Sequence, residues 1–335
     1  MILVTGGTGM IGAHVLLALA KEKRTTLALY RRENSIAKIA DFFKLKAPEH
    51  PEYFEQIQWH QSELNDLIQL EIIFPKITEV YHCAAKVSFA EHHTKKLIKT
   101  NIEGTANLVN LALKYKVKKF GYLSSIAALG VASTEALVNE DQLWNSNETH
   151  TPYAYSKYGA ELEVWRGSQE GLDVVILNPG IVLGSHFWNS SSGSLIKRVA
   201  QGMNFSPTGN AAIVSVDDVV EVLLSLMKSS IKNERFILVA ENRPYKELIK
   251  RTASVLGVRA PRFSLSKTLL YLLFFIDKTA YALGLKKSFL NRATIKSLCS
   301  QQKYNGSKIK RCLDFTYKNL DQMLKEIAQD YPLPH

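Results

Sequence analysis

Short apolar runs alternate with longer amphipathic segments over about the first two-thirds of the 335-residue chain. The runs predict strands and the segments between them predict helices. Strands separated by helices at this spacing are joined by right-handed crossovers, which gives a parallel, doubly wound α/β sheet. The expected strands are Ile2–Val4, Thr26–Tyr30, Ile57–His60, Val80–Cys83, Phe120–Ser124, Val174–Asn178 and Arg235–Val239, and the expected helices are Ile11–Lys23, Ser35–Leu45, Ile68–Phe74, Lys95–Lys114, Tyr153–Glu170, Leu195–Gly202, Val216–Lys228 and Tyr245–Leu256.

The pattern changes after Asn178-Pro179-Gly180. Residues 185–212 are rich in Ser, Gly and Asn, and the tail from Ser264 is helical in pattern and rich in lysine. We therefore expect two parts. The first is a nucleotide-binding domain that comprises residues 1–180 and, roughly, residues 213–240. The second is a small, mostly helical substrate-binding lobe formed by the other residues of 181–335.

The first strand leads directly into a glycine-rich turn. Residues 5–12 read Thr-Gly-Gly-Thr-Gly-Met-Ile-Gly between an apolar run and a helical pattern. Gly6 permits the sharp turn, Gly9 lets the backbone approach a pyrophosphate, and Gly12 allows helix and strand to pack closely. The helix N-terminus at Met10 and Ile11 offers free N–H groups and a positive dipole end. The sequence therefore predicts a dinucleotide site here.

Composition and charge narrow the class of protein. Hydrophobic residues make up 46% and charged residues 22%, as in an ordinary soluble globular protein. The net charge is +11, but the basic residues are scattered and no aromatic-interleaved stripe accompanies them, so we expect no nucleic-acid partner. Three cysteines without metal-binding spacing indicate reduced thiols, no metal site and a cytoplasmic location. Met1 leads straight into the first strand, so no targeting segment is expected.

One stretch in the tail is strongly apolar. Residues 268–276 read Thr-Leu-Leu-Tyr-Leu-Leu-Phe-Phe-Ile and are flanked by Lys267, Asp277 and Lys278. This run is too short to span a membrane. A buried helix is the expected structure, and a helix lying in a membrane interface is the alternative.

Two motifs suggest catalysis. Tyr153 and Lys157 are four residues apart and so share one helix face. A free phenol has a pKa near 10, and a nearby cation favours the phenolate and lowers that pKa toward the working range. Ser124 and Ser125 close a strand at the carboxyl edge of the sheet, where ligands of open α/β folds bind. A hydroxyl there can polarise a carbonyl.

Taken together, these motifs resemble the extended short-chain dehydrogenases/reductases, nearest to dihydroflavonol reductase and 3β-hydroxysteroid dehydrogenase-like members. The resemblance covers roughly residues 1 to 260 and implies a Rossmann-type domain with a small C-terminal lobe. The segments that carry it are Thr5 to Gly12, Tyr81 to Ala85, Asn101 to Leu108, Ser124-Ser125, the Tyr153/Lys157 pair and Asn178 to Gly180.

The resemblance also implies roles for individual residues. Tyr153 matches the family's acid/base, Lys157 its ribose-binding partner, and Ser125 its substrate-polarising serine, with Ser124 as the alternative. Asn101 lies on the long helix that faces the site in many relatives, and Trp188 in the following lobe suits an aromatic or apolar substrate. Backbone near the cofactor is implied for Leu64, Ala84, Ala85, Pro179 and Gly180.

The chain departs from the family at two cofactor positions. NAD-preferring relatives carry an acid at the end of the second strand, where this chain has Arg31-Arg32. Arg31 followed by Lys38 looks like the 2′-phosphate pair of dihydroflavonol reductase-type members, so NADP(H) is favoured, with NAD(H) as the alternative. Glu63 stands near the position where the family usually has an aspartate beside adenine.

The expected activity is NAD(P)-dependent interconversion of a carbonyl and an alcohol on a small, apolar or aromatic substrate. Residues 126–128 after Ser125 carry no titratable group, which argues against a dehydratase. The alternatives are an NAD-dependent nucleotide-sugar epimerase and a cofactor-binding sensor without turnover. Relatives often dimerise through the helices expected at Lys95–Lys114 and Tyr153–Glu170, so a homodimer is also expected.

Overall fold

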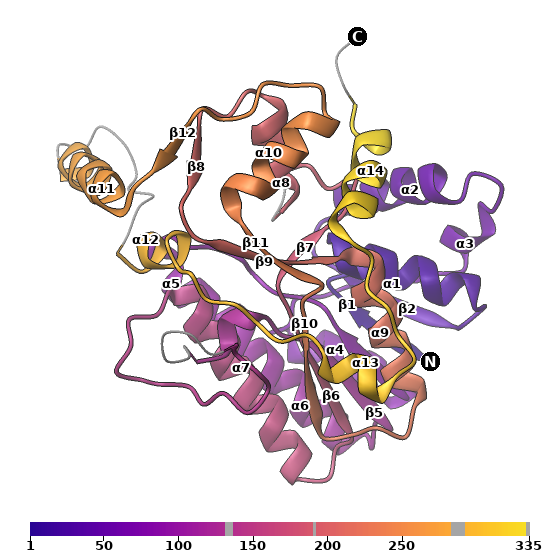
Figure 1. Cartoon of the computed structure of the whole chain (residues 1–335). Coiled ribbons are helices and arrows are strands. Elements are labelled where there is room, and N and C mark those ends of the chain that lie inside the picture. Colours follow the sequence, from indigo (N-terminus) through magenta and orange to yellow (C-terminus); the bar gives the residue numbers. More distant parts are fainter. Residues whose placement is uncertain (131–136, 190–191, 283–291, 333–335) are drawn as a thin grey trace.

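The computed structural model describes residues 1–130, 137–189, 192–282 and 292–332. Seven parallel strands form the central sheet in the order β10-β6-β5-β4-β1-β2-β3 (Figure 1). This is the doubly wound sheet that the apolar runs predict. Its strands are β1 (Ile2–Thr5), β2 (Thr26–Tyr30), β3 (Gln58–Gln61), β4 (Glu79–His82), β5 (Lys119–Leu123), β6 (Val174–Pro179) and β10 (Glu234–Leu238).

Helices cover both faces of this sheet, and each layer buries its own apolar core. One core joins α1 (Met10–Lys21), α2 (Asn34–Lys46) and α9 (Val216–Lys228) to the sheet. The other core joins α4 (Leu67–Ile73), α6 (Gly104–Lys114) and α7 (Pro152–Gln169) to the opposite face. The short helix α3 (Glu52–Glu55) connects α2 to β3.

The chain leaves the main sheet after β6 and builds a second unit before and after β10. A three-stranded sheet contains β7 (Ile181–Leu183), β9 (Asn210–Ser215) and β11 (Glu241–Pro244), and β8 (Phe205–Pro207) pairs with β12 (Phe263–Leu265). A third core lies among α8 (Gly193–Ala200), α10 (Tyr245–Val255) and α14 (Leu320–Asp330). Three further helices lie toward the C-terminus: α11 (Lys267–Ala282), α12 (Arg292–Leu298) and α13 (Lys308–Cys312).

Two expected helices differ in the structure. The helix expected over 95–114 is divided into α5 (Thr94–Leu97), a π-helical segment at Ile98–Glu103 and α6. The apolar helix α11 is not fully buried, because only its inner side packs against the protein, through Leu270 and Phe274. Among the described residues, no helix is both long and apolar enough to cross a membrane.

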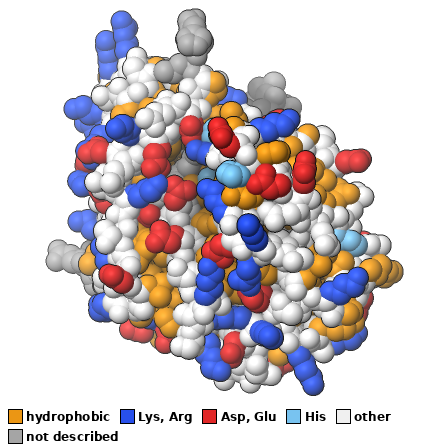
Figure 2. Space-filling model, turned by 90° about the vertical axis from the view of Figure 1, so that its right-hand side faces the viewer, with side chains coloured by type: hydrophobic (Ala, Val, Ile, Leu, Met, Phe, Trp, Pro, Cys, Tyr) orange, Lys and Arg blue, Asp and Glu red, His pale blue; other side chains and the backbone are white. Residues whose placement is uncertain are grey.

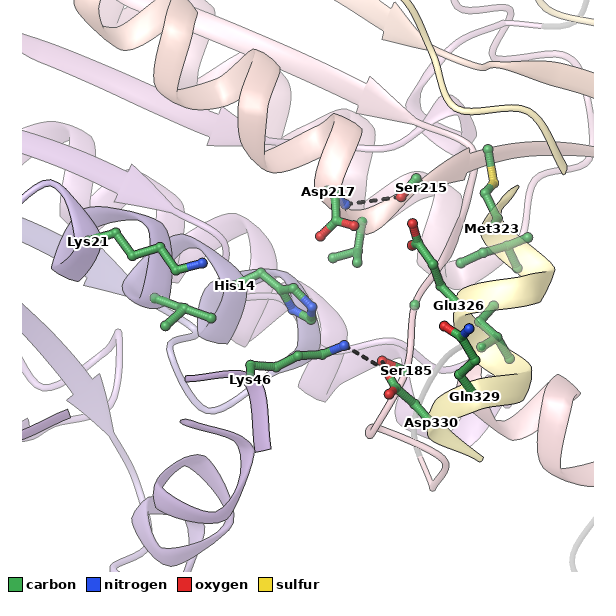
Figure 3. A pocket seen from close by; sticks show the side chains of 15 residues that line it. His14, Lys21, Lys46, Ser185, Ser215, Asp217, Met323, Glu326, Gln329 and Asp330 are labelled. Atoms are coloured by element: carbon green, nitrogen blue, oxygen red, sulfur yellow. Dashed lines mark hydrogen bonds and ion pairs between the residues drawn. The ribbon is translucent and has the colours of Figure 1, made fainter. Parts of the chain in front are cut away.

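The C-terminal helix returns to the N-terminal half of the molecule. A cavity of about 310 Å³ lies between α1, the loop after β7, the start of α9 and α14 (Figure 3). At its edge, Lys46 Nζ at the end of α2 lies 2.5 Å from Asp330 Oδ2 at the end of α14. Ser185 Oγ donates to the same carboxylate oxygen at 2.6 Å. These contacts fasten α14 to the N-terminal half of the molecule.

Candidate active site

The glycine turn between β1 and α1 is shaped by close backbone contacts. Gly6 has a φ of +71°, and a Cβ on it would lie 2.6 Å from the Ala84 backbone nitrogen. A Cβ on Gly12 would lie 2.1 Å from the Gly6 carbonyl oxygen. A Cβ on Gly9 would approach the protein no closer than 3.4 Å, so this glycine is not required by packing within the described chain. Its open side fits a phosphate group.

The start of α1 is prepared for an anion. Gly9 occupies the N-cap position, and among the described residues no side chain caps it or places an acid in the first turn. The N–H groups at Met10 and Ile11 therefore lie at an uncompensated positive helix end. The turn thus fits the pyrophosphate of a dinucleotide.

The neighbouring strand ends are held rigidly beside this turn. His82 is fully buried, with Nδ1 2.7 Å from Thr5 Oγ1 and Nε2 2.9 Å from Thr105 Oγ1. Burial, aided by the Lys157 charge, lowers the pKa of His82 to about 3, so its ring stays neutral. The Ala84 backbone N–H also donates to Thr5 Oγ1, at 3.2 Å. Sequence reasoning gave His82 no role, because only the fold brings its two threonine partners together.

The groups expected around adenine and ribose lie along the same edge. Asn107 Nδ2 donates to the Leu64 carbonyl oxygen at 3.1 Å and fixes the loop after β3. Arg31 and Lys38 are exposed, and neither has an ion pair recorded within the described part of the chain. Their cationic groups are therefore available to a ligand. Of the other residues expected to contact the cofactor, Glu63 and Ala85 are exposed. Pro179 is buried at the end of β6. The Gly180 N–H donates to the Leu238 carbonyl oxygen at 3.1 Å.

Ser125, Tyr153 and Lys157 form the candidate catalytic group, and Lys157 is its most deeply buried member. Its Nζ donates to the Leu123 carbonyl oxygen at 2.7 Å and lies 4.4 Å from the centroid of the Tyr122 ring. Burial lowers the pKa of Lys157 to about 7, although the charge of Glu161 acts in the opposite direction. The amine is thus held at the end of β5, at the residue that precedes the two serines.

Tyr153 lies one helical turn before Lys157 and meets Ser125. Burial raises the pKa of Tyr153, and a hydrogen bond with the Ser125 side chain lowers it. Ser125 Oγ also accepts the Ala127 N–H at 3.1 Å, which sets the start of the short helical turn that follows β5. The structure therefore brings together Tyr153, Lys157 and Ser125.

Ser124 belongs to a different, buried polar network. Its Oγ donates to Glu161 Oε2 at 2.6 Å, and Asn178 Nδ2 donates to the same oxygen at 2.8 Å. Arg235 Nη1 donates to Glu161 Oε1 at 3.1 Å from the edge strand β10. The Ser124 hydroxyl is thus engaged by the protein, which favours Ser125 over Ser124 as the group that meets a substrate.

The two other expected substrate residues also have structural partners. Asn101 Oδ1 accepts the Lys86 N–H at 2.8 Å, and its Nδ2 donates to the Lys86 carbonyl oxygen and to Ser156 Oγ. Asn101 therefore ties the loop after β4 to α7. The Trp188 ring lies 4.8 Å from the Tyr331 ring, in the core beneath α14. This geometry assigns both side chains to the scaffold, and their contact with substrate stays a prediction.

A parallel sheet with an anion-ready glycine turn beside a Ser-Tyr-Lys group defines an NAD(P)-dependent enzyme of the extended short-chain dehydrogenase/reductase class. Residues 2–239 match the NAD dependent epimerase/dehydratase family, and the chain belongs to that family. Its members bind NAD(P) and include reductases, epimerases and dehydratases.

Several named proteins are similar over most of their length. A sterol demethylase protein B of Methylococcus capsulatus is 27% identical over 80% of this chain and 78% of its own. A putative dihydroflavonol 4-reductase of Synechocystis is 25% identical over 96% of this chain and 92% of its own. Among solved structures, gox2253 superposes with a TM-score of 0.81 at 25% identity and covers 98% of this chain and 97% of its own.

Proposed function

We propose that this protein interconverts a carbonyl and an alcohol on a small apolar or aromatic substrate, using NADP(H). The observation that carries the proposal is that Tyr153 hydrogen-bonds with Ser125 and lies one helical turn before the buried Lys157. The relatives named as dihydroflavonol and anthocyanidin reductases support a reduction rather than an epimerisation.

Each residue of the group has a distinct task. When bound, the nicotinamide supplies or accepts the hydride at the reacting carbon. In the reductive direction, Ser125 Oγ donates a hydrogen bond to the carbonyl oxygen, and Tyr153 transfers its phenolic proton to that oxygen as it gains charge. The Lys157 ammonium stabilises the phenolate that remains, which counters the effect of burial on the tyrosine. In the oxidative direction Tyr153 takes the proton from the alcohol.

Preference for NADP(H) rests on the basic groups after β2. Arg31 and Lys38 follow the strand whose end meets the adenine ribose in this fold, and their exposed charges suit a 2′-phosphate. We expect NADPH to bind at least about tenfold more tightly than NADH, a difference of about 1.4 kcal/mol. Energy transfer from protein tryptophan to the nicotinamide measures both dissociation constants, and equal affinities would contradict the proposal.

The variant Tyr153→Phe tests the reaction itself. Without the phenolic proton, turnover of ketones and aldehydes with NADPH should fall by about 10² to 10⁴-fold, while the dissociation constant of NADPH stays nearly unchanged. Tyr158→Phe is the matched control, because Tyr158 stacks on Trp144 with the ring centroids 4.3 Å apart. Full activity of Tyr153→Phe would refute the mechanism. Wild-type turnover of nucleotide sugars but not of carbonyls would identify an epimerase, and no turnover of either would support a sensor.

A further inference from the structure

The positive charge of this chain is concentrated in one segment. Residues 258–311 hold twelve of the 42 Lys and Arg residues but one of the 31 acidic residues, Asp277. The rest of the chain therefore has 30 residues of each sign and no net charge. Figure 2 shows the side of the molecule away from α11, where basic and acidic side chains are interspersed. We call residues 258–311 the basic segment. It runs from β12 through α11 and α12 to α13, and eight of its twelve basic residues lie at positions 259–296.

Helix α11 projects from the body of the protein within this segment (Figure 1). Its inner side packs Leu270 and Phe274 against Ile295. Its outer side is also apolar, with Leu272 56% and Phe275 59% exposed and with Leu269 and Leu273 also exposed. A helix that is apolar on both sides normally has both sides covered, so the outer face requires a partner.

The same helix borders a cavity at the start of α7, the helix that carries Tyr153. A cavity of about 360 Å³ lies between the inner side of α11, the start of α12 and the start of α7. Phe274 and Arg292 line one side of this cavity. Pro152, the residue before Tyr153, lines the other. A surface bound by the outer face of α11 would therefore lie near a cavity that is lined by the residue before Tyr153.

We propose that the outer face of α11 and the basic segment dock on an anionic lipid surface. Apolar side chains on a helix lying in the interface enter the headgroup boundary, while flanking Lys and Arg residues are attracted to acidic lipids. A second copy of this chain fits less well, because a twofold contact would bring two basic segments together. Nucleic acid would leave the exposed leucines and phenylalanine without apolar contact. The inference concerns a surface and does not depend on the reaction proposed above.

The test is cosedimentation of the full-length protein with phosphatidylcholine/phosphatidylserine vesicles, compared with phosphatidylcholine alone. We expect binding to the mixed vesicles that weakens as salt is added. The variant Leu272→Gln/Phe275→Gln should lower the partition coefficient at least about tenfold, and Arg259→Gln/Arg262→Gln, which removes exposed charge from the segment, should lower it to a similar extent. The matched control is Ile68→Gln/Ile72→Gln, two exposed apolar residues on α4.

Loss of vesicle binding can be distinguished from loss of folding and from loss of cofactor binding. All three variants should keep the wild-type thermal midpoint and NADPH affinity, because none of the substituted side chains is buried. Absence of vesicle binding at low salt, or equal loss in the α4 control, would overturn the proposal. So would light scattering that shows a dimer dissociated by the α11 variant, or binding of duplex or single-stranded oligonucleotides in place of vesicles.

Discussion

Burial of the Lys157 ammonium makes the stability of the protein depend on pH. The pKa of this lysine is about 7 in the folded protein against 10.5 for an ordinary lysine. Between these values the unfolded state binds more protons, so the free energy of unfolding should rise with pH. The cofactor-free protein should gain about 2 kcal/mol from this residue between pH 7 and pH 9, measured by urea unfolding.

A variant without the amine isolates this effect. Lys157→Met should lack the increase. Lys119→Met, which removes another buried lysine whose Nζ donates to the Leu226 carbonyl oxygen, should retain most of it. Tyrosines with raised pKa values, such as Tyr317, act in the opposite direction only at higher pH, which is why the range ends at pH 9. If the free energy of unfolding rose with pH equally in the wild type and in Lys157→Met, the lysine would not be buried as described.

Glu161 is predicted to be a positioning residue for the catalytic group. Its carboxylate binds Ser124 and Arg235, and its charge raises the pKa of Lys157. Glu161→Gln removes that charge and should lower the pKa of Lys157. The limb of the pH profile of kcat/KM that depends on this lysine should therefore shift to lower pH, and kcat/KM at neutral pH should fall about tenfold. Glu163→Gln is the control, since Glu163 pairs at the surface with Arg166 on the same helix. A loss of activity without a shift in the pH profile would indicate a structural role only.

The proximity of the candidate catalytic residues Tyr153 and Lys157 could be predicted because their relation is local. Tyr153 and Lys157 are four residues apart, and a helix brings such residues to one face in any fold. Glu161 stands four residues further on, yet its importance was not predicted. Its partner Arg235 is 74 residues away in sequence and reaches it only because β10 joins β6 at the edge of the sheet.

Elements of the central sheet were largely predictable, because strands such as β1 and β6 are buried apolar runs, whereas the edge strand β3 is polar and partly exposed. The strands β7, β9 and β11 were missed. β7 and β11 have only three and four residues, and β9 pairs with one strand before it and one after it in the sequence. The π-helical segment at Ile98–Glu103 also has no local signal. It contains Asn101, whose side chain is held by Lys86 and Ser156 from two other segments.

The contact between Lys46 at the end of α2 and Asp330 at the end of α14 is predicted to stabilise the docking of α14. Burial opposes ionisation of Asp330, but hydrogen bonds from Lys46 and Ser185 outweigh it and hold its pKa below the ordinary value. Asp330→Asn should therefore lower the free energy of unfolding by about 1 to 2 kcal/mol at neutral pH. The difference from wild type should shrink as pH falls through the pKa of Asp330, because a protonated Asp330 is also neutral.

A substitution on the same helix checks that this loss is specific. Asp321→Asn removes a strongly exposed carboxylate that pairs with Arg251 and should change unfolding by less than about 0.5 kcal/mol. Limited proteolysis should release the C-terminal segment faster in Asp330→Asn than in Asp321→Asn. Equal unfolding curves for the two variants would show that α14 is held by its apolar face alone.

At the scale of the whole molecule, the net positive charge is unevenly distributed along the chain. The basic segment carries the entire net charge of +11, and the remainder of the chain, which includes the nucleotide-binding half, is neutral. A general positive field is therefore not what attracts the anionic cofactor. At physiological ionic strength, exposed charges separated by more than about 8 Å are largely screened from one another. Discrimination between NADPH and NADH must then come from the groups beside the adenine ribose.

This distribution of charge predicts different effects on cofactor binding for Arg31 and for the pair Arg259 and Arg262. Arg31→Ala should weaken NADPH binding about tenfold and leave NADH binding nearly unchanged, because only NADPH carries the 2′-phosphate. Arg259→Gln/Arg262→Gln removes twice the charge but should alter neither dissociation constant, since both residues belong to the basic segment and neither follows β2. Tryptophan energy transfer with each cofactor provides the four comparisons. If Arg31→Ala weakened both cofactors equally, the arginine would contact the shared pyrophosphate or ribose, and the case for NADP(H) would rest on Lys38 alone.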